Sequence, residues 1–393
     1  MRRVGGAWLD GDAAQSLLRT LEAGGHQAYA VGGCVRNALM GVPVTDLDVA
    51  TDARPGRVTE LAEARGWRVV PTGLEHGTVT VVIDGEGHEV TTFRRDVATD
   101  GRRAVIAFAD RLEDDAARRD FTMNALYARA DGSLTDPVGG LGDLAARRVR
   151  FIGHPEDRIR EDFLRILRFF RFHALYGDAG EGLDPDGLAA AATHAAGLER
   201  LSAERVGAEM RKLLAAPDPA PAVAAMAMTG VLAHALPGAD PRALAPLVHL
   251  EGQAGLPPEP LRRLVALGGV DVETRLRLSR AEARRLEIMR TLVASGAGVA
   301  ADAYRHGAGA AYDGAILRAA LTDQPLPGDL AREAARGAEA SLPVSAADLM
   351  PALSGAALGR GLAAAEAAWI GSDFTLDRAA LIRAGTEAGQ TGD

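Results

Sequence analysis

The chain has 393 residues, of which 47% are hydrophobic and 25% are charged, and its formal net charge is −9. This length exceeds one ordinary hydrophobic core, so we expect two or more domains. No stretch approaches the ~20 apolar residues of a membrane span, the first residues lack the apolar core of a signal peptide, and a single cysteine, Cys34, excludes an internal disulfide framework. These features predict a cytoplasmic protein with no membrane partner.

The first predicted elements are a helix over residues 12–22 and a strand over 28–31, with Gly24 and Gly25 between them. The strand leads into Gly32 and Gly33, which predict a turn, and then into a short helix over residues 35–40. A double glycine that opens a helix leaves backbone N–H groups available to an anion, and Arg36 adds a cation beside them. This stretch therefore predicts a phosphate-binding turn.

Two aspartates follow the turn. We expect Asp46 and Asp48 on a second strand, where a spacing of two places both side chains on the same face. Carboxylates that face a phosphate site are typical of metal-dependent nucleotidyl transfer, because they hold Mg²⁺ and the cation offsets the charge on the reacting phosphate. A glycine pair or a DxD alone is usually an ordinary turn or a solvated strand edge, but the two in this order favour the functional interpretation.

A helix over residues 55–65 and a short strand over 67–70 come next, followed by β-rich runs at 78–83 and 88–92 that the sequence DGEG joins as a hairpin. The pattern predicts a small mixed sheet with flanking helices. Glu89, on the second hairpin strand, is the best candidate for a third carboxylate. In the alternative interpretation, Glu89 is an exposed strand residue that pairs with Arg94 or Arg95.

The segment 94–113 is predicted to be a charged surface loop. The string RRDFTMNAL follows it and contains Arg118, Arg119, Asp120 and Asn124. Two guanidinium groups can each form paired hydrogen bonds with triphosphate oxygens. The adjacent carboxylate can accept a hydrogen bond from a ribose hydroxyl, which would select ribonucleotides.

Beyond the sequence DPVGG at 136–140 no convincing strand pattern remains, and helical periodicity runs almost to the end. We therefore expect an α+β fold with three parts: a head over 1–140, a helical neck over 141–215, and a helical body and tail over 216–393. Although the chain is acidic, residues 147–171 hold eight arginines against four acids, a net charge of +4. Such a local concentration matters more for nucleic-acid binding than the total charge.

A single helix is predicted over residues 160–172. Its apolar positions have the spacing i, i+3, i+4, i+7 and form one buried face: Phe163, Ile166, Leu167 and Phe170. Asp162 and Arg165 would lie one turn apart on the other side. A carboxylate and a guanidinium so placed match the donor and acceptor edges of cytosine and adenine but not those of uracil and guanine. Arg168 and Arg171 continue the spacing and are expected to reach phosphate or ribose.

Taken in order, GGCVRNALMG with DLD, HEVTTFR, RRDFTMNAL, EDFLR and LSAER with EMRKLL resemble the class II tRNA nucleotidyltransferases and bacterial poly(A) polymerases. These enzymes form a branch of the polymerase-β nucleotidyltransferase superfamily. The resemblance covers about residues 28–214. One departure is Asn37, which stands where the family usually has aspartate. In the last motif Ser202 is expected to cap a helix, and Arg205 to pair with Glu209 at i,i+4.

The resemblance implies a polymerase-β-like head with a helical neck, body and tail, and a CCA-adding activity on the 3′ end of tRNA with CTP and ATP as substrates. It implies Mg²⁺ at Asp46 and Asp48, with Glu89 as a further catalytic acid. It also implies a nucleotide site made of Gly32, Gly33, Arg36, Arg118, Arg119, Asp120, Asn124, Asp162, Arg165, Arg168 and Arg171. It associates the segment 94–113 with addition of the terminal A, and no stable protein partner is predicted.

Four alternatives remain. A bacterial poly(A) polymerase would share every catalytic residue, although the sequence at 71–80 looks like the CCA-adding version of this region. Addition of CC alone or of A alone is also possible. An RNA-binding protein without catalysis is disfavoured by the intact DLD, RRD and EDxxR sequences. A nucleotidyltransferase for sugars or antibiotics would need neither the Asp162 and Arg165 pair nor a long helical half.

Overall fold

The computed structural model describes residues 3–99, 104–178, 180–350 and 352–391, with backbone alone at 96–99 and 104–106. The chain divides into two compact units. The first consists of Met1–Pro241 and Gly268–Leu278, and the second of Arg242–Leu267 and Ser279–Asp393. The chain therefore leaves the first unit after residue 241 and returns to it for one short segment.

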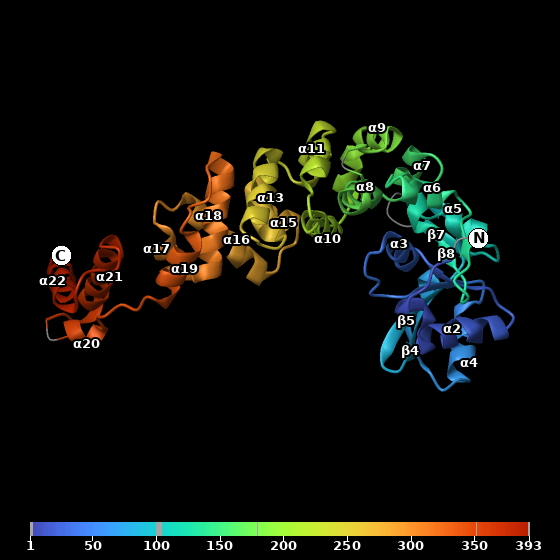
Figure 1. Ribbon diagram of the computed structural model, residues 1–393, viewed down its shortest axis with the longest axis horizontal. Helices are drawn as coiled ribbons and strands as arrows, with labels where there is room; N and C mark the ends of the chain where they lie inside the picture. The colour runs from blue at the N-terminus through green and yellow to red at the C-terminus, as the bar shows by residue number, and fades with distance from the viewer. Residues whose placement is uncertain (1–2, 100–103, 179, 351, 392–393) are drawn as a thin grey trace. The chain divides into compact units, whose positions relative to one another are not determined.

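The first unit begins with the β-sheet domain, labelled in Figure 1. Its strands are β1 (Ala28–Val31), β2 (Asp48–Thr51), β3 (Arg68–Gly73), β4 (Thr78–Ile83), β5 (Glu86–Thr92), β6 (Arg94–Thr99), β7 (Ala104–Phe108), β8 (Tyr127–Ala128) and β9 (Leu134–Thr135). Its helices are α1 (Ala7–Asp10), α2 (Asp12–Ala23), α3 (Gly33–Met40), α4 (Pro55–Glu63), η1 (Leu74–His76), α5 (Leu112–Ala117), η2 (Thr122–Asn124) and α6 (Gly140–Ala145). Helices carry the chain on from there, which confirms the predicted α+β fold class.

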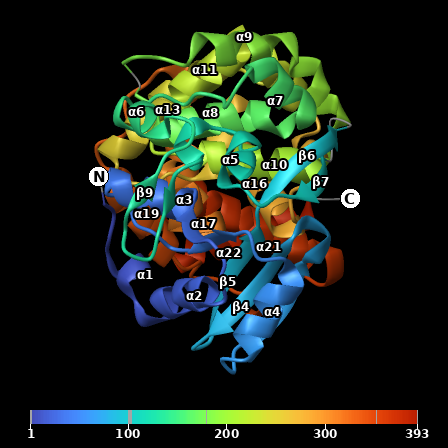
Figure 2. The ribbon, with the colours of Figure 1, turned by 90° about the vertical axis from the view of Figure 1, so that its right-hand side faces the viewer.

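Seven strands form one sheet in the order β3-β4-β5-β2-β1-β8-β9. Every neighbouring pair is antiparallel except β2 and β5, which run parallel. Helices α2 and α4 pack against the sheet, as Figures 1 and 2 show. The β4–β5 hairpin turns at Asp84 and Gly85, whose φ angles of 51° and 89° are both positive. The turn is therefore a two-residue type I′ turn, tighter than the four residues predicted.

The prediction of a loop over residues 94–113 is wrong for most of that segment. Strands β6 and β7 pair antiparallel as a separate two-stranded sheet, and α5 follows them. Val97 and Thr99 on one strand, and Val105 and Ile106 on the other, supply the β-branched residues that favour strands despite the charged neighbours. The charged sequence 100–103 lies outside the described residues.

The helices of the first unit continue with α7 (Pro155–Glu161), α8 (Leu164–Tyr176), α9 (Pro185–Thr193), η3 (Ala195–Arg200), α10 (Ala203–Leu214), α11 (Ala220–Met228), α12 (Val231–Ala235) and α15 (Val272–Arg275). The predicted helix over 160–172 is in fact two helices. Asp162 has extended backbone angles (φ −154°, ψ 108°) and its side chain accepts a hydrogen bond from the Leu164 N–H at 3.1 Å. Aspartate favours such caps over helix interiors, which explains the break. The predicted apolar face is buried throughout.

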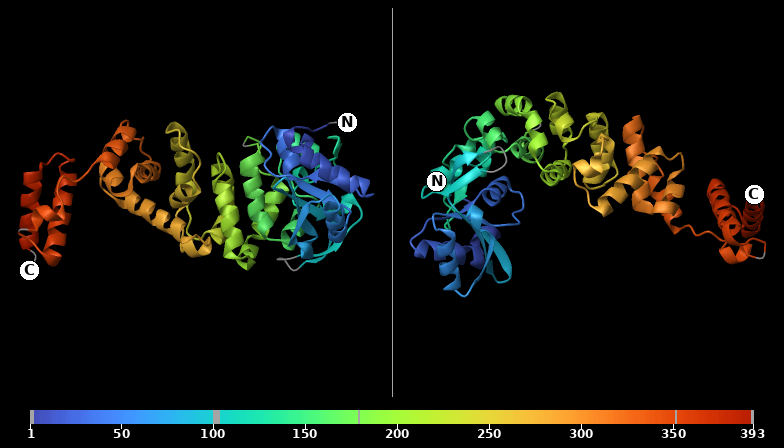
Figure 3. Two further views of the ribbon diagram at one scale, coloured as in Figure 1. Left: turned by 90° about the horizontal axis from the view of Figure 1, so that it is seen from below. Right: turned by 180° about the vertical axis from the view of Figure 1, so that it is seen from behind.

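The second unit is entirely helical in its described residues. Its elements are α13 (Leu244–Gln253), α14 (Pro260–Leu267), α16 (Arg280–Ala294), α17 (Val299–His306), α18 (Ala308–Thr322), α19 (Leu330–Glu339), α20 (Ala346–Leu349), α21 (Gly355–Gly371) and α22 (Arg378–Gln390), with η4 (Pro241–Ala243) at its start. Helices α21 and α22 pack closely, as Figure 3 shows in red, because Gly361 and Gly385 each lie against the other's backbone carbonyl.

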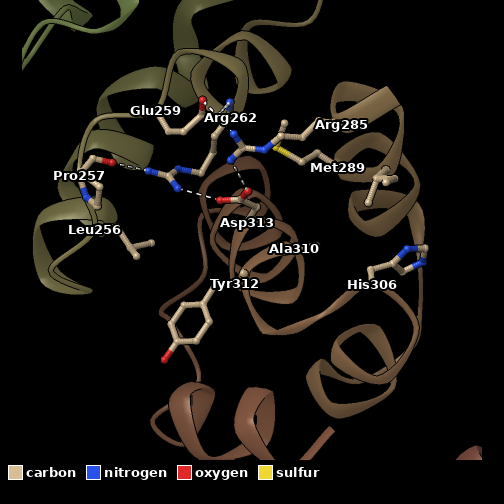
Figure 4. Close-up of a pocket in the computed structure, with 12 residues that line it drawn as sticks. Leu256, Pro257, Glu259, Arg262, Arg285, Met289, His306, Ala310, Tyr312 and Asp313 are labelled. Atoms are coloured by element: carbon tan, nitrogen blue, oxygen red, sulfur yellow. Dashed lines mark hydrogen bonds and ion pairs between the residues drawn. The ribbon is translucent and has the colours of Figure 1, made fainter. Parts of the chain in front are cut away.

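A cluster of buried charges lies between α13, α14 and α18 of this unit. Glu251 accepts hydrogen bonds from Arg262 and Arg263, and Asp313 accepts from Arg262 at 2.7 Å. A pocket of about 590 Å³ opens beside this cluster (Figure 4), with Arg285 linking Asp313 and Glu259 at its rim. Among the described residues, no helix has the length and apolar character needed to cross a bilayer.

Candidate active site

The three candidate carboxylates lie at the one parallel strand pair of the sheet. Asp48 on β2 and Glu89 on β5 are direct register partners, and both side chains are exposed while the next pair, Val49 and Val90, is buried. Strand β2 begins at Asp48, so Asp46 precedes the strand rather than lying on it as predicted. Leu47 between the two aspartates is buried, which leaves both carboxylates facing solvent.

The pKa of Asp48 lies above its ordinary value. Desolvation by surrounding protein is the largest cause, and repulsion from the Glu89 and Asp46 carboxylates adds to it, while Arg119 opposes the shift. The described residues contain no preassembled group of three metal-ligating side chains. Mg²⁺ usually keeps several waters and binds one or two carboxylates together with substrate phosphates. The repelling carboxylates at Asp48, Glu89 and Asp46 therefore fit a divalent cation of this kind.

The glycine turn has the conformation and the neighbours of an anion site. Gly32 has a φ of 76° and caps α3, whose first N–H groups point out of the helix. A Cβ on Gly32 would lie 3.3 Å from Nη1 of Arg119, so this guanidinium stands directly beside the turn. Helix α3 begins at Gly33, two residues before the predicted start. Sequence reasoning thus found both halves of this site, but not their contact.

Asp115 and Tyr127 hold the Arg119 side chain in place. Its guanidinium donates to Asp115 Oδ2 at 3.0 and 3.1 Å and to the Tyr127 hydroxyl at 3.1 Å, and Tyr127 also donates to Asp115. Burial alone would raise the pKa of Asp115, but the charge of Arg119 and the hydrogen bond from Tyr127 outweigh it and hold the pKa below its usual range. Asp115 and Tyr127 were not predicted as site residues, although the i,i+4 spacing of Asp115 and Arg119 was a usable signal. Arg118 ends α5 and accepts from Arg165 through its backbone carbonyl.

Cys34 links α3 to β2. Its thiol donates to the Val31 carbonyl at 3.3 Å and accepts from the backbone N–H of Asp48. Burial raises the pKa of this thiol to about 11. Cys34 therefore stays protonated and has the structural role that a small buried residue suggested.

Arg36 is buried and bonded within the protein. It donates to Asn124 Oδ1 at 2.5 Å, to Asn37 Oδ1 at 2.8 and 3.1 Å, and to the Tyr176 hydroxyl at 2.8 Å. Asn37 also donates to the Pro43 carbonyl at 3.2 Å. At the position where the family usually has aspartate, the amide oxygen of Asn37 thus accepts from Arg36 and its amide nitrogen donates to Pro43. Burial lowers the pKa of Arg36. These contacts favour a supporting position for Arg36 behind the glycine turn.

Asp120 and Asn124 connect the sheet domain to helix α8. Asp120 Oδ1 accepts from Asn124 at 2.9 Å and from the Phe121 N–H at 2.8 Å, and its Oδ2 accepts from Arg168 at 2.5 and 2.8 Å. Burial by itself would raise the pKa of Asp120, but the charge of Arg168 and these hydrogen bonds lower it overall. Asp120 is thus ionised and already paired with another predicted site residue.

Asp162 and Arg165 lie at the break between α7 and α8, each with its own partner. Asp162 Oδ2 accepts from Arg205 on α10 at 2.6 Å. Arg165 donates to Glu161 at 2.5 Å and to the carbonyls of Arg158 and Arg118 at 3.0 and 2.9 Å. Their spacing is set by a tight turn at the break, in which the Arg165 N–H donates to the Asp162 carbonyl at 3.0 Å, and not by the interior of one continuous helix. Arg205 was predicted to pair with Glu209, and this is wrong because Asp162 occupies it.

Arg171 is buried rather than exposed on a polar helix face. It donates to Glu209 of α10 at 2.6 Å, which ties the two helices together. Ser202 accepts from the Arg205 N–H at 3.4 Å and caps α10 as predicted. The sequence reasoning missed Tyr176, the last residue of α8, which contacts Arg36. Its i,i+4 spacing from Phe172 was the available signal.

Two family models match the chain. Residues 28–150 match the poly A polymerase head domain, and residues 182–242 match a domain described as the probable RNA and SrmB-binding site of polymerase A. The first match spans β1 to α6 and includes the glycine turn, the three carboxylates and RRDFTMNAL.

Curated relatives align with part of the chain. The mitochondrial CCA tRNA nucleotidyltransferase 1 of Homo sapiens is 41% identical over 204 residues, which is 52% of this chain and 47% of that protein. The CCA-adding enzyme of Lacticaseibacillus paracasei is 42% identical over 211 residues, 53% of this chain and 51% of that protein. The chain thus matches about half the length of these curated relatives.

A solved structure extends the likeness to the whole chain. The Bacillus stearothermophilus CCA-adding enzyme in complex with CTP superposes with a TM-score of 0.74 at 30% identity, and the match covers 96% of this chain and 97% of that one. The similarity therefore includes both the carboxylate-bearing sheet and the helical remainder. With this match along nearly its full length, the chain belongs to the family of CCA-adding enzymes.

Proposed function

We propose that the protein is a CCA-adding tRNA nucleotidyltransferase, which adds C, C and A to the tRNA 3′ end from CTP and ATP without a template and releases pyrophosphate. The observation that carries this proposal is the pairing of Asp48 with Glu89 on neighbouring strands, in the same unit as a glycine turn that Arg119 adjoins. The names of the curated relatives and the CTP in the solved relative support it.

Nucleotidyltransferases of this family use a divalent metal ion, and we propose Mg²⁺. Asp46 and Asp48 would hold it, with Glu89 as the third carboxylate of the site. When bound, the cation supplies positive charge to the reacting phosphate and lowers the pKa of the attacking 3′-hydroxyl. Strand pairing fixes the backbones of Asp48 and Glu89 side by side, so rotation of their exposed side chains would bring their oxygens to the ion.

The protein's own groups would bind and orient the nucleotide. The N–H groups at the start of α3 and the guanidinium of Arg119 face the place where a triphosphate would lie, and Arg118 is proposed to add a second guanidinium. Asp120, held ionised by Arg168 and Asn124, would accept from a ribose hydroxyl. Arg36 and Asn124 keep this carboxylate and the glycine turn in a fixed relation.

Asp162 and Arg165 are proposed to select the base. Each oxygen of Asp162 accepts one hydrogen bond within the protein and retains a lone pair for an exocyclic amino group. The Nη2 of Arg165 donates one N–H to the Arg118 carbonyl and has a second N–H for a ring nitrogen. Cytosine and adenine offer that combination, whereas uracil and guanine offer the reverse.

We further propose that residues 1–140 act as the catalytic head and 141–215 as the neck that carries base selection. In the neck, Arg168 would orient the ribose-binding Asp120, and Arg171 would tie α8 to α10. Residues 216–393 would be the body and tail that hold tRNA by shape and phosphate contacts. The compartment proposed is the cytoplasm, where the free thiol of Cys34 would remain reduced.

The test is nucleotide incorporation into tRNA transcripts that end before CCA, after C and after CC. Each of CTP, ATP, UTP and GTP is supplied with Mg²⁺, and products are sized at single-nucleotide resolution. We expect two C and one A, followed by a stop, and loss of all addition in Asp46→Ala. Arg57→Ala on the exposed side of α4 is the control for handling and folding.

Other outcomes identify the alternatives. Long A tails would assign the chain to the poly(A) polymerases, whose head-domain model it matches. A stop after CC, or addition of A only to transcripts ending in CC, would identify a partial activity. No incorporation at all would leave an RNA-binding protein or a small-molecule acceptor.

A further inference from the structure

Helix α8 is attached to the sheet domain at three successive points. Near its start Arg165 donates to the Arg118 carbonyl, and one turn later Arg168 pairs with Asp120. At its last residue, Tyr176 accepts from Arg36 of α3 at 2.8 Å. Each of the three contacts involves a residue of the sequence motifs, but Tyr176 itself lies outside them.

The contact between Tyr176 and Arg36 combines a hydrogen bond with cation–π contacts. The Arg36 guanidinium carbon lies 4.0 Å from the centroid of the Tyr176 ring and 5.3 Å from that of Phe172. Such cation–π contacts are strongest when the cation is desolvated, and Arg36 is 6% exposed. Arg36 thus joins α8 to the glycine turn through both a hydrogen bond and two aromatic rings.

These contacts close a ring around the candidate site. Arg36 also donates to Asn124, Asn124 donates to Asp120, and Asp120 accepts from Arg168 on α8. The ring returns along α8 from Arg168 to Tyr176. The direction of the helix relative to the glycine turn is therefore fixed at two separate points instead of one.

The contact at Tyr176 matters because it is far from Arg165 along α8. Arg165 and Tyr176 are eleven residues apart, about 16 Å along a helix. If the Tyr176 contact is lost, α8 can pivot about the Arg168–Asp120 pair, about 4.5 Å from Arg165, and a rotation of about 13° would then move the Arg165 end by about 1 Å. A misplacement of about 1 Å is enough to spoil a hydrogen-bonded reaction geometry.

We propose that Tyr176 is a positioning residue for nucleotide selection, which fixes α8 through Arg36 so that Arg165 meets the base of a nucleotide held at the glycine turn. The proposal rests on the proposed function. Tyr176 need not touch the nucleotide, because it acts through Arg36 and the helix axis.

The experiment compares Tyr176→Phe, Arg36→Lys and the double variant with the unaltered protein, using tRNA transcripts that end before CCA. Steady-state kcat and KM are measured separately for CTP, ATP, UTP and GTP. Tyr176→Phe keeps the ring and loses the hydroxyl, and Arg36→Lys keeps the charge and loses the planar guanidinium. We expect kcat/KM for CTP to fall about tenfold and the relative use of UTP to rise.

The chain offers a matched control. Tyr29 also accepts from an arginine, Arg129, at 3.1 Å, and the Arg129 guanidinium lies 5.2 Å from its ring centroid. Tyr29 lies on β1, and the other contacts described for its side chain are with Gln27, Phe93 and Tyr127, which all lie outside α8. Tyr29→Phe should lower thermal stability about as much as Tyr176→Phe, but leave the preference for CTP over UTP unchanged.

Each result has a defined meaning. If Tyr176→Phe and Arg36→Lys act through one contact, the double variant should prefer CTP over UTP as strongly as the single variant with the weaker preference. If Tyr176→Phe lowers stability and kcat while the CTP to UTP ratio stays that of the unaltered protein, Tyr176 is merely structural and the proposal fails. Failure of the proposed function is seen separately, because the unaltered protein would then not add C, C and A. Should Tyr176→Phe fold poorly, Arg36→Lys decides on the same ratio.

Discussion

At the residue scale, the ring of Phe172 shows how a basic sequence becomes a packed interior. The guanidinium carbons of Arg36, Arg168 and Arg171 lie 5.3, 5.1 and 4.6 Å from its centroid. Two buried acids, Asp120 and Glu209, pair with Arg168 and Arg171. Arginine spacing therefore predicted an exposed cationic face where the protein instead has buried ion pairs around an aromatic ring.

The shifted pKa of Asp48 gives a prediction about stability. Because its folded-state pKa is raised, the folded protein binds a proton more tightly than the unfolded chain does. The free energy of unfolding therefore begins to fall as the pH rises past the unfolded-state aspartate pKa, about 3.9, and the fall is complete once the pH has passed the raised pKa of folded Asp48. Asp48→Asn should abolish nucleotide addition, yet raise the metal-free Tm at pH 7 by about 1–3 °C, since solvent screens this exposed group.

Differential scanning fluorimetry at pH 7 and pH 3, without divalent cations, checks this expectation. The two proteins should have the same Tm at pH 3, where Asp48 is protonated in both states. Glu181→Gln, at an exposed residue outside helices and strands, makes the same change in net charge and serves as the control. A lower Tm for Asp48→Asn at pH 7 would contradict the argument.

At the element scale, helix α10 depends on a close approach to the returning segment. A Cβ on Gly207 would lie 2.0 Å from the Leu276 carbonyl oxygen, and Arg211 donates to the same carbonyl at 3.0 Å. Gly207→Ala should therefore separate the two elements and lower the free energy of unfolding by about 3 kcal/mol. Because α10 also carries Arg205 and Glu209, base selection should weaken too.

Urea unfolding and the CTP to UTP ratio measure the two effects. Gly142→Ala in α6 is the matched control, because nothing lies within 4 Å of its added Cβ. An exposed helical glycine gains stability on change to alanine, by up to about 1 kcal/mol. Equal stability of the two variants would show that α10 tolerates the displacement.

Much of the element order could be predicted from sequence. Strands β1 and β4 have the predicted bounds, and the glycine turn, the hairpin and the apolar face of α8 were found. The break at Asp162 was missed because helical periodicity continues across it, while a local side-chain hydrogen bond decides the backbone. Asp162, Arg165 and Arg36 also have partners far away in the chain, which spacing rules cannot reach: Arg205, the Arg118 carbonyl, Asn124 and Tyr176.

At the scale of the whole molecule, the last segment of the first unit, Gly268–Leu278, follows a segment of the second unit, Arg242–Leu267. Leu236 packs against Gly269, and the Val270 N–H donates to the Pro237 carbonyl at 2.8 Å. A fragment 1–241 stops near the end of the second family match but lacks this segment. It should unfold at a lower urea concentration than a fragment 1–278, because Gly207, Arg211 and Leu236 lose their partners.

Circular dichroism during urea unfolding distinguishes the two fragments, and limited proteolysis within residues 203–241 supplies a second measure. Coincident unfolding curves would show that the returning segment adds nothing to the first unit. Addition of the Leu276→Ala change to fragment 1–278 controls for side-chain packing, since the backbone carbonyl that Arg211 contacts is kept.

The parallel pairing of β2 with β5 also has a consequence for the order of events during folding. Asp48 and Glu89 become neighbours only after the intervening helix α4 and strands β3 and β4 have formed their crossover. Until that long closure is complete, the nascent chain offers a cation only the local Asp46 and Asp48 pair, without Glu89. A divalent ion should therefore leave the refolding rate unchanged and slow the unfolding rate, because it completes its binding only after the rate-limiting closure.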